Sequence, residues 1–142
     1  MGRIYVHLHG AAKEKSYAKM IEVYGSRLKQ RNIEIKTHSN KKNLEQYYND
    51  LNKLTSLYLL DERGVEYSSV EFAKVLNIWH VGTEDVNIAI GPVEGWQNIT
   101  LSNSNLISLS KMTLPHELAA VILVEQIYRA TEINRGSQYH RM

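Results

Sequence analysis

The chain has 142 residues, of which 43% are hydrophobic and 23% are charged, with a formal net charge of +2 and no cysteine. These values exclude wholesale disorder, disulfides and thiolate metal sites, and they predict one domain spanning residues 1–142. No stretch approaches the about 18 continuous apolar residues of a membrane span, and the first residues lack the pattern of a secretion signal. We therefore expect a soluble, cytoplasmic protein with no membrane association.

Strands and helices alternate in the first half of the chain. Residues 3–8 alternate apolar and polar side chains, which is typical of a strand, and residues 13–30 carry apolar side chains at helical spacing. Residues 33–38 alternate again and predict a second strand, and residues 43–54 predict a second helix. A helix between two strands is the unit from which parallel sheets are built.

The second half continues this alternation. A continuous apolar run ending in a polar turn predicts a strand buried on both faces, Ser68 or Ser69 is a good N-cap, and Pro115 belongs at the first position of a helix. In chain order, the elements are a strand at 56–61, a helix at 69–80, a strand at 86–91, a short strand at 106–110 and a helix at 115–133. The whole pattern predicts an α/β fold, a three-layer sandwich with a mostly parallel sheet.

Three loops that follow buried strands are candidates for a ligand site. They are "LLDERG" (residues 59–64), "IGPVEGW" (90–96) and "LSKMTLPH" (109–116). In a parallel sheet they would project from one edge and form one pocket, although each loop alone could serve only turn geometry or a helix start. None matches a phosphate-binding loop, which disfavours a nucleotide phosphate. A ligand with an adenine ring and a thioether-like arm could be held by main-chain groups and by apolar side chains, namely Leu60, Leu109, Met112 and Leu114.

Histidines and basic residues add two further observations. His7 and His9 could pair on a metal, but no third ligand lies nearby in sequence, which favours a core or surface role and no metal. The adjacent Tyr139, His140 and Arg141 give the C-terminal tail more chemistry than a structural tail needs. Basic residues concentrate between residues 13 and 42 and again near the C-terminus, which indicates either a basic face or a solvated charged surface.

The segment "LSKMTLPHELAAVILVEQIYRA", the terminal "YHR" and the upstream "LLDERG" and "IGPVEG" together resemble the SPOUT-class family of large-subunit ribosomal RNA methyltransferase H. The resemblance is clear from about residue 56 to residue 141 and looser before it. It implies an α/β sandwich with a C-terminal trefoil knot, and a homodimer that uses S-adenosylmethionine to methylate N3 of a pseudouridine in 23S ribosomal RNA.

The resemblance also implies a set of site residues. The cofactor would be bound by Leu60, Asp61, Gly91, Pro92, Glu94, Gly95, Leu109, Ser110, Lys111, Met112, Thr113 and Leu114. The catalytic and substrate residues would be Arg129, Tyr139, His140 and Arg141. His140 would accept or relay the N3 proton, with Glu94 as the alternative base. The arginines would stabilise the charged pyrimidine, Tyr139 would stack on a flipped base, and His116 would fix a loop or an interface.

The chain departs from the family pattern in the second loop, where Pro92 stands in place of a glycine and Val93 in place of the proline. Proline has no N–H, so a close main-chain contact with the cofactor would change. This departure keeps open an alternative, a non-catalytic RNA- or ribosome-binding relative with the same fold, although the "YHR" tail argues against it. The strongly apolar helix at 115–133 is expected to be buried on more than one side, which favours a homodimer through that helix.

Overall fold

The computed structural model describes residues 2–97, 99 and 105–141. Its elements are β1 (Ile4–His9), α1 (Lys15–Lys29), β2 (Ile33–His38), α2 (Leu44–Leu51), β3 (Leu57–Glu66), α3 (Ser69–Val81), β4 (Val86–Ile90), β5 (Asn105–Ser108) and α4 (His116–Asn134). In this part of the chain the strands form one sheet in the order β2-β1-β4-β3-β5, and neighbouring strands pair in parallel throughout. The predicted alternation of strands and helices is confirmed.

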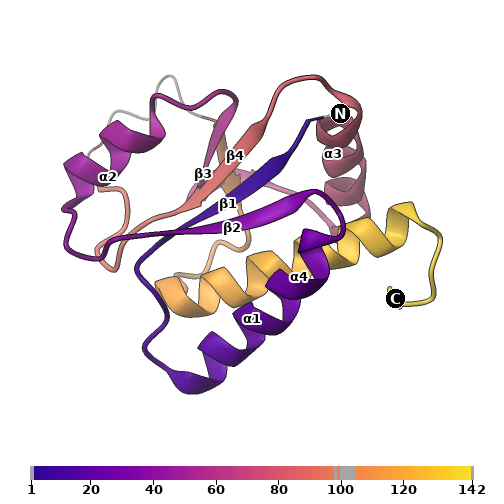
Figure 1. Cartoon of the computed structure of the whole chain (residues 1–142), viewed down its shortest axis with the longest axis horizontal. Helices are drawn as coiled ribbons and strands as arrows, with labels where there is room; N and C mark the ends of the chain where they lie inside the picture. Colours follow the sequence, from indigo (N-terminus) through magenta and orange to yellow (C-terminus); the bar gives the residue numbers. More distant parts are fainter. Residues whose placement is uncertain (1, 98, 100–104, 142) are drawn as a thin grey trace.

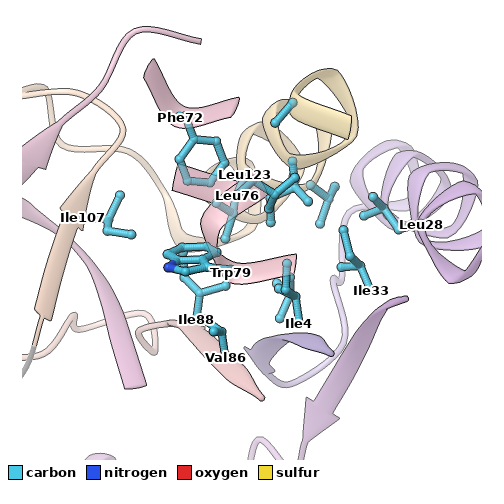
Figure 2. Packing of buried hydrophobic residues seen from close by; sticks show 14 of the residues in the cluster. Ile4, Leu28, Ile33, Phe72, Leu76, Trp79, Val86, Ile88, Ile107 and Leu123 are labelled. Carbon is cyan, nitrogen blue, oxygen red and sulfur yellow. The ribbon is translucent and has the colours of Figure 1, made fainter. Parts of the chain in front are cut away.

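Helices cover both faces of the sheet, as the three-layer prediction requires. Figure 1 shows α2 on one side of the sheet and α1 and α4 on the other. Because strand side chains alternate between faces, Ile4, Val6 and Ile88 join a core under α1, α3 and α4. Figure 2 shows that core, in which the ring of Trp79 lies close to Ile88 beneath Phe72 and Leu76 of α3.

A second, smaller core lies under α2. Its buried members are Tyr47, Leu51, Leu59, Ala89 and Trp96. Tyr47 and Leu51 come from α2, Leu59 and Ala89 come from neighbouring central strands, and Trp96 comes from the loop after β4. This core fastens that loop to the sheet, which is where the candidate site begins.

The final helix is buried on several sides, as its composition predicts. It packs against both α1 and α3, and residues such as Leu123, Val124 and Ile127 are fully covered. Much of the apolar surface that we expected at a subunit interface is therefore covered by the same chain. Among the described residues, no helix combines the length and the apolarity needed to cross a bilayer.

Two local expectations were wrong in detail. Pro115 is the N-cap of α4 with φ −56° and ψ 144°, so the helix begins at His116; its carbonyl accepts a hydrogen bond from the N–H of Ala119. The segment 59–64 is not a simple loop, because β3 continues to Glu66 and resumes its pairing with β5 after a register shift between Leu60 and Val65. Gly64 permits the close approach of β3 to β5 at this shift, because any larger residue would clash: a Cβ at position 64 would lie 2.5 Å from the carbonyl carbon of Leu106.

Candidate functional site

A pocket of about 240 Å³ lies beside the register shift within β3, at the ends of β4 and β5 and next to the first turn of α4. It is lined by residues 60–62, 90–96, 109–110 and 112–114, and by His116 and Ala119. The expectation that the three loops meet at one edge of the sheet is confirmed. All of the predicted cofactor-binding residues line the pocket except Lys111, which is exposed.

Two hydrogen bonds tie the three segments together. The indole N–H of Trp96 donates to the carbonyl oxygen of Leu60 at 3.0 Å, and the hydroxyl of Thr113 donates to the carboxylate of Glu62 at 2.8 Å. Trp96 is 2% exposed and stacks on Tyr47 with ring centroids 5.6 Å apart. Our reading of the sequence missed Trp96, although a large aromatic residue directly after a glycine-rich loop was an available signal. Through its hydrogen bond to Leu60 and its stacking on Tyr47, Trp96 fixes the geometry of the pocket.

The loop after β4 is shaped by its glycines. A Cβ on Gly91 would lie 3.1 Å from the indole nitrogen of Trp96, so a side chain there would press on the ring. Gly95 has a φ of +73°, a conformation that other residues adopt with strain, and its N–H donates to the carbonyl of Pro92 at 2.8 Å. Pro92 is buried and lines the pocket without filling it.

Negative charge dominates the pocket rim. Asp61, Glu62 and Glu94 all line it, whereas no lysine or arginine does within the described residues. A side-chain hydrogen bond from Arg63 is the main reason that the pKa of Asp61 lies below its usual value. Burial lowers the pKa of His116, which favours the neutral imidazole. Such a rim attracts a cation and repels a phosphate.

The predicted substrate residues form a second cluster, on the C-terminal half of α4. Arg129 contacts His140 through Nη1 and Nδ1 at 3.1 Å, and its guanidinium lies 5.0 Å from the ring centre of Tyr139. Glu125 joins the cluster, because it accepts hydrogen bonds from Arg129 and from the hydroxyl of Tyr139, both at 2.9 Å. Burial raises the pKa of Tyr139, and the hydrogen bonds to Tyr24 and Glu125 add to that effect. Arg141 is exposed beside these residues in sequence.

The pocket and the tail cluster lie at opposite ends of α4. His116 lines the pocket, and Arg129 is thirteen residues further along the helix, a rise of about 20 Å. Figure 1 shows the C-terminus at the end of α4 remote from its first turn. One chain alone therefore does not bring the predicted substrate residues to the predicted cofactor pocket.

The remaining sequence candidates, His7 and His9, are engaged in hydrogen bonds. His7 is 4% exposed and contacts His38 through Nδ1 and Asn87 through Nε2, both at 2.8 Å. His9 Nε2 lies 2.7 Å from the carbonyl oxygen of Lys42. Both rings have a structural role here. Within residues 2–97, 99 and 105–141, no group of three or more His, Asp or Glu side chains is arranged to hold a metal ion.

Comparison with solved structures supports the fold class. The crystal structure of TrmJ from Z. mobilis ZM4 matches with a TM-score of 0.53 and 8% sequence identity, covering 100% of this chain and 72% of that one. At that identity the likeness concerns the fold alone. A family model described as "Predicted SPOUT methyltransferase" matches residues 3–140. The chain therefore belongs to the SPOUT methyltransferase family.

Comparison with curated proteins identifies the group within this family that the chain resembles. Ribosomal RNA large subunit methyltransferase H of Koribacter versatilis is 49% identical over 86 residues, 59% of this chain and 59% of that protein. A protein of the same name from Prochlorococcus marinus is 38% identical over 123 residues, 85% of this chain and 83% of that protein. These matches confirm the resemblance to the methyltransferase H family. The chain spans 54% to 66% of the length of the first three relatives.

Proposed function

We propose that the chain is an S-adenosylmethionine-dependent methyltransferase that modifies N3 of a pseudouridine in large-subunit ribosomal RNA. One observation carries this proposal: the three segments that the family resemblance assigns to the cofactor meet in a single pocket with an acidic rim. Curated relatives are named ribosomal RNA large subunit methyltransferase H. The same proposal implies action in the cytoplasm, where bacterial ribosomes are.

The residues that line the pocket suit the chemistry of the proposed cofactor. Leu60, Leu109 and Leu114 offer apolar surface to an adenosine, and the backbone around Gly91 and Gly95 offers main-chain groups. The carboxylates of Glu62 and Glu94 suit a ligand that carries a positive sulfonium and an ammonium group, whereas Asp61 is already paired with Arg63. When bound, the cofactor supplies an electrophilic methyl group for an in-line displacement.

Calorimetric titration with S-adenosylmethionine tests the cofactor site and the non-catalytic alternative together. Micromolar binding is expected for the wild type. Gly91→Ala should weaken it by about tenfold or more, because the new methyl group presses Trp96 towards the pocket. Gly82→Ala is the matched control, since its Cβ would lie 3.4 Å from Ile78 O, an ordinary contact far from the pocket in the fold. No binding to the wild type at millimolar ligand would favour the non-catalytic, ribosome-binding alternative.

The chemical task of the tail cluster is to hold a pyrimidine whose N3 proton is leaving. The charge that spreads onto the flanking carbonyl oxygens needs donors nearby. Because a guanidinium only donates, His140 Nδ1 accepts from Arg129 in this arrangement, and in a neutral ring the hydrogen is then on Nε2. We assign Arg129 and Arg141 to stabilising the anionic pyrimidine, and His140 to donating or relaying a proton beside them.

Tyr139 is placed to position this cluster. Its hydroxyl is bonded to Glu125, and one face of its ring carries the Arg129 guanidinium. A ring held in this way orients Arg129, and contact with a flipped base is the role that the family resemblance implies for it. Glu94, exposed on the pocket rim, is the alternative acceptor for the N3 proton. Glu94→Gln should lower kcat by at least about 100-fold if Glu94 accepts the N3 proton directly, and leave kcat unchanged if the proton leaves through the His140 relay.

A homodimer resolves the separation of the pocket from the tail. Leu118, Ile122, Gln126 and Arg129 are only partly buried and follow one another at helical spacing, so they mark one face of α4. If two copies pack this face antiparallel about Ile122, Arg129 of one chain lies level with the start of α4 in the other. Each pocket then faces the tail of the second copy.

Mixing two inactive variants tests this arrangement. A tail variant (Arg141→Ala) and a pocket variant (Gly91→Val) are each expected to be inactive, but their heterodimer contains one intact pocket beside one intact tail. Random pairing should restore about one quarter of wild-type activity. Ile122→Glu should give a monomer in sedimentation experiments, with Ile78→Glu, on an exposed position of α3, as the control. Heterodimers without recovered activity would contradict the shared site.

Two further implications of the family remain proposals of the same kind. We propose that residues 1–142 form one SPOUT domain, which the single sheet and the two cores on its faces support. We also propose that the C-terminal part is threaded into a trefoil knot. Very slow refolding from denaturant, measured by fluorescence of Trp79 and Trp96, would support the knot, because threading must precede the final packing.

A further inference from the structure

The guanidinium of Arg27 is held by aromatic rings and has no acidic partner among the described residues. It lies 5.3 Å from the ring centre of Tyr24 and 5.2 Å from that of Tyr128, so it sits against two aromatic rings from α1 and α4. It takes part in no ion pair within the described residues, and its side chain is exposed. Two rings hold the planar group in place while its N–H donors remain available to a ligand.

Aromatic contacts connect Arg27 to the tail cluster. Tyr128 packs edge-on against Tyr139 with ring centroids 5.0 Å apart, and the hydroxyls of Tyr24 and Tyr139 lie 3.3 Å apart. Arg129 covers the far side of this row, 5.0 Å from the Tyr139 ring centre. We call this row, from Arg27 through Tyr24, Tyr128 and Tyr139 to Arg129, the α1–α4 seam.

The surroundings of the seam carry a surplus of positive charge. Glu132 accepts a hydrogen bond from Tyr128 and pairs with Arg31 at 3.3 Å and with Arg135 at 4.0 Å. Glu125 is held by Arg129 and the tyrosine hydroxyl, as described above. The guanidinium groups of Arg31, Arg129 and Arg135 pair with these two carboxylates. Arg27 is a fourth guanidinium on the seam, and it has no acidic partner among the described residues.

We propose that the α1–α4 seam binds the phosphate backbone of the RNA substrate, and that Arg27 contacts a phosphate beyond the nucleotide held at the tail. The inference rests on the proposed function and extends its substrate site onto α1. An arginine fixed by aromatic rings loses little freedom when it binds, and its planar fork matches a phosphate bidentately. Interleaved cations and aromatic rings are typical of surfaces that bind single-stranded and loop nucleotides.

Titration of a fluorescently labelled RNA stem-loop that contains pseudouridine tests the proposal. Arg27→Gln should raise the Kd about tenfold, the value of one charge-assisted hydrogen bond, and lower the slope of log K against log salt by about 0.7 to 1. Its affinity for S-adenosylmethionine and its kcat at saturating RNA should equal those of the wild type, with the loss confined to the KM for RNA.

Lys36→Gln is the matched control. Lys36 is also an exposed cation over a tyrosine ring, 5.4 Å from the centre of Tyr5, but it pairs with Glu34 and alternates with Ile33 and Ile35 on β2, which places it on the opposite face of the sheet. This variant should bind RNA as the wild type does. Circular dichroism melting verifies that both variants are folded.

The outcomes separate the two levels of inference. A wild type that binds neither the RNA stem-loop nor S-adenosylmethionine overturns the proposed function. A wild type that binds both, with Arg27→Gln binding RNA equally well at every salt concentration, overturns the seam alone. Equal losses in Arg27→Gln and Lys36→Gln would also overturn it, because they would indicate only a general effect of net charge.

Discussion

Acidification below pH 6.5 should destabilise the fold through the buried ring of His7. The side-chain amide of Asn87 donates to the carbonyl of Thr55 at 2.8 Å, so its oxygen must accept from His7 Nε2. His7 Nδ1 then accepts from His38 Nε2. In this arrangement both rings are neutral. A second proton on His7 would sit on Nδ1 and point at the N–H of His38 Nε2, so the hydrogen bond between the two rings would be lost. Burial lowers the pKa of His7 to about 4, and the Asn87 hydrogen bond opposes that shift only in part.

The magnitude follows from the difference between the folded and unfolded pKa values. One pKa unit corresponds to about 1.4 kcal/mol, so a fall from 6.5 to about 4 is worth roughly 3 kcal/mol. The unfolded chain takes up this proton below pH 6.5 and the folded chain does so only near pH 4. The free energy of unfolding therefore falls between these values, by about 2 kcal/mol at pH 5 relative to pH 8. A loss of about 2 kcal/mol is a large fraction of the net free energy of unfolding of a domain, which is roughly 5 to 15 kcal/mol.

Urea unfolding at pH 8 and pH 5 measures this loss. The pKa values of His38, His80 and His116 are also lowered, mainly by burial, so they add to the loss in the wild type. His7→Leu isolates the contribution of His7: it should be less stable at pH 8, because Asn87 and His38 lose a partner, yet lose about 2 kcal/mol less on acidification. An NMR titration of the wild type supplies an independent check. A His7 ring that titrates near pH 6.5 would refute the reasoning.

Three further predictions concern single side chains. Trp96→Phe leaves the Leu60 carbonyl without its donor and should cost about 1 to 3 kcal/mol of stability and weaken S-adenosylmethionine binding in calorimetry; unchanged affinity would show that the indole does not fix the pocket. Gly95→Ala should cost about 1 kcal/mol in thermal melts, because its φ is +73°; an unchanged Tm would contradict the strain argument. Ser68→Ala removes the N-cap of α3 and should cost about 1 kcal/mol in urea unfolding, with Ser26→Ala at an exposed position of α1 as the control.

Local sequence signals were sufficient for most of the fold. The apolar alternation of β1 and the capping position of Ser68 depend on residues a few positions apart, and the structure places both as expected. The meeting of the three loops was predicted nearly as well, because parallel strands bring their following loops to one edge. That rule turned three weak loop signals into one pocket.

The features that were missed depend on contacts between distant parts of the chain. The continuation of β3 past Asp61 requires β5 to pair with it, and Gly64 permits the close backbone approach. The hydrogen bond from Trp96 to Leu60 joins residues 36 positions apart, and the His7–His38 pair arises from the register of β1 on β2. No local pattern encodes such pairings, so a single sequence could not reveal them.

The length of α4 sets the distance between the pocket and the tail cluster. Its 19 residues fix how far the tail stands from the pocket, because a helix cannot stretch. An inserted residue would move everything beyond it by about 1.5 Å and turn it by about 100°, which would carry Arg129 off the face it shares with Ile122. We therefore expect descendants of this sequence to exchange the apolar side chains of α4 only for others of similar volume and to conserve its length, with insertions confined to the loops that join other elements.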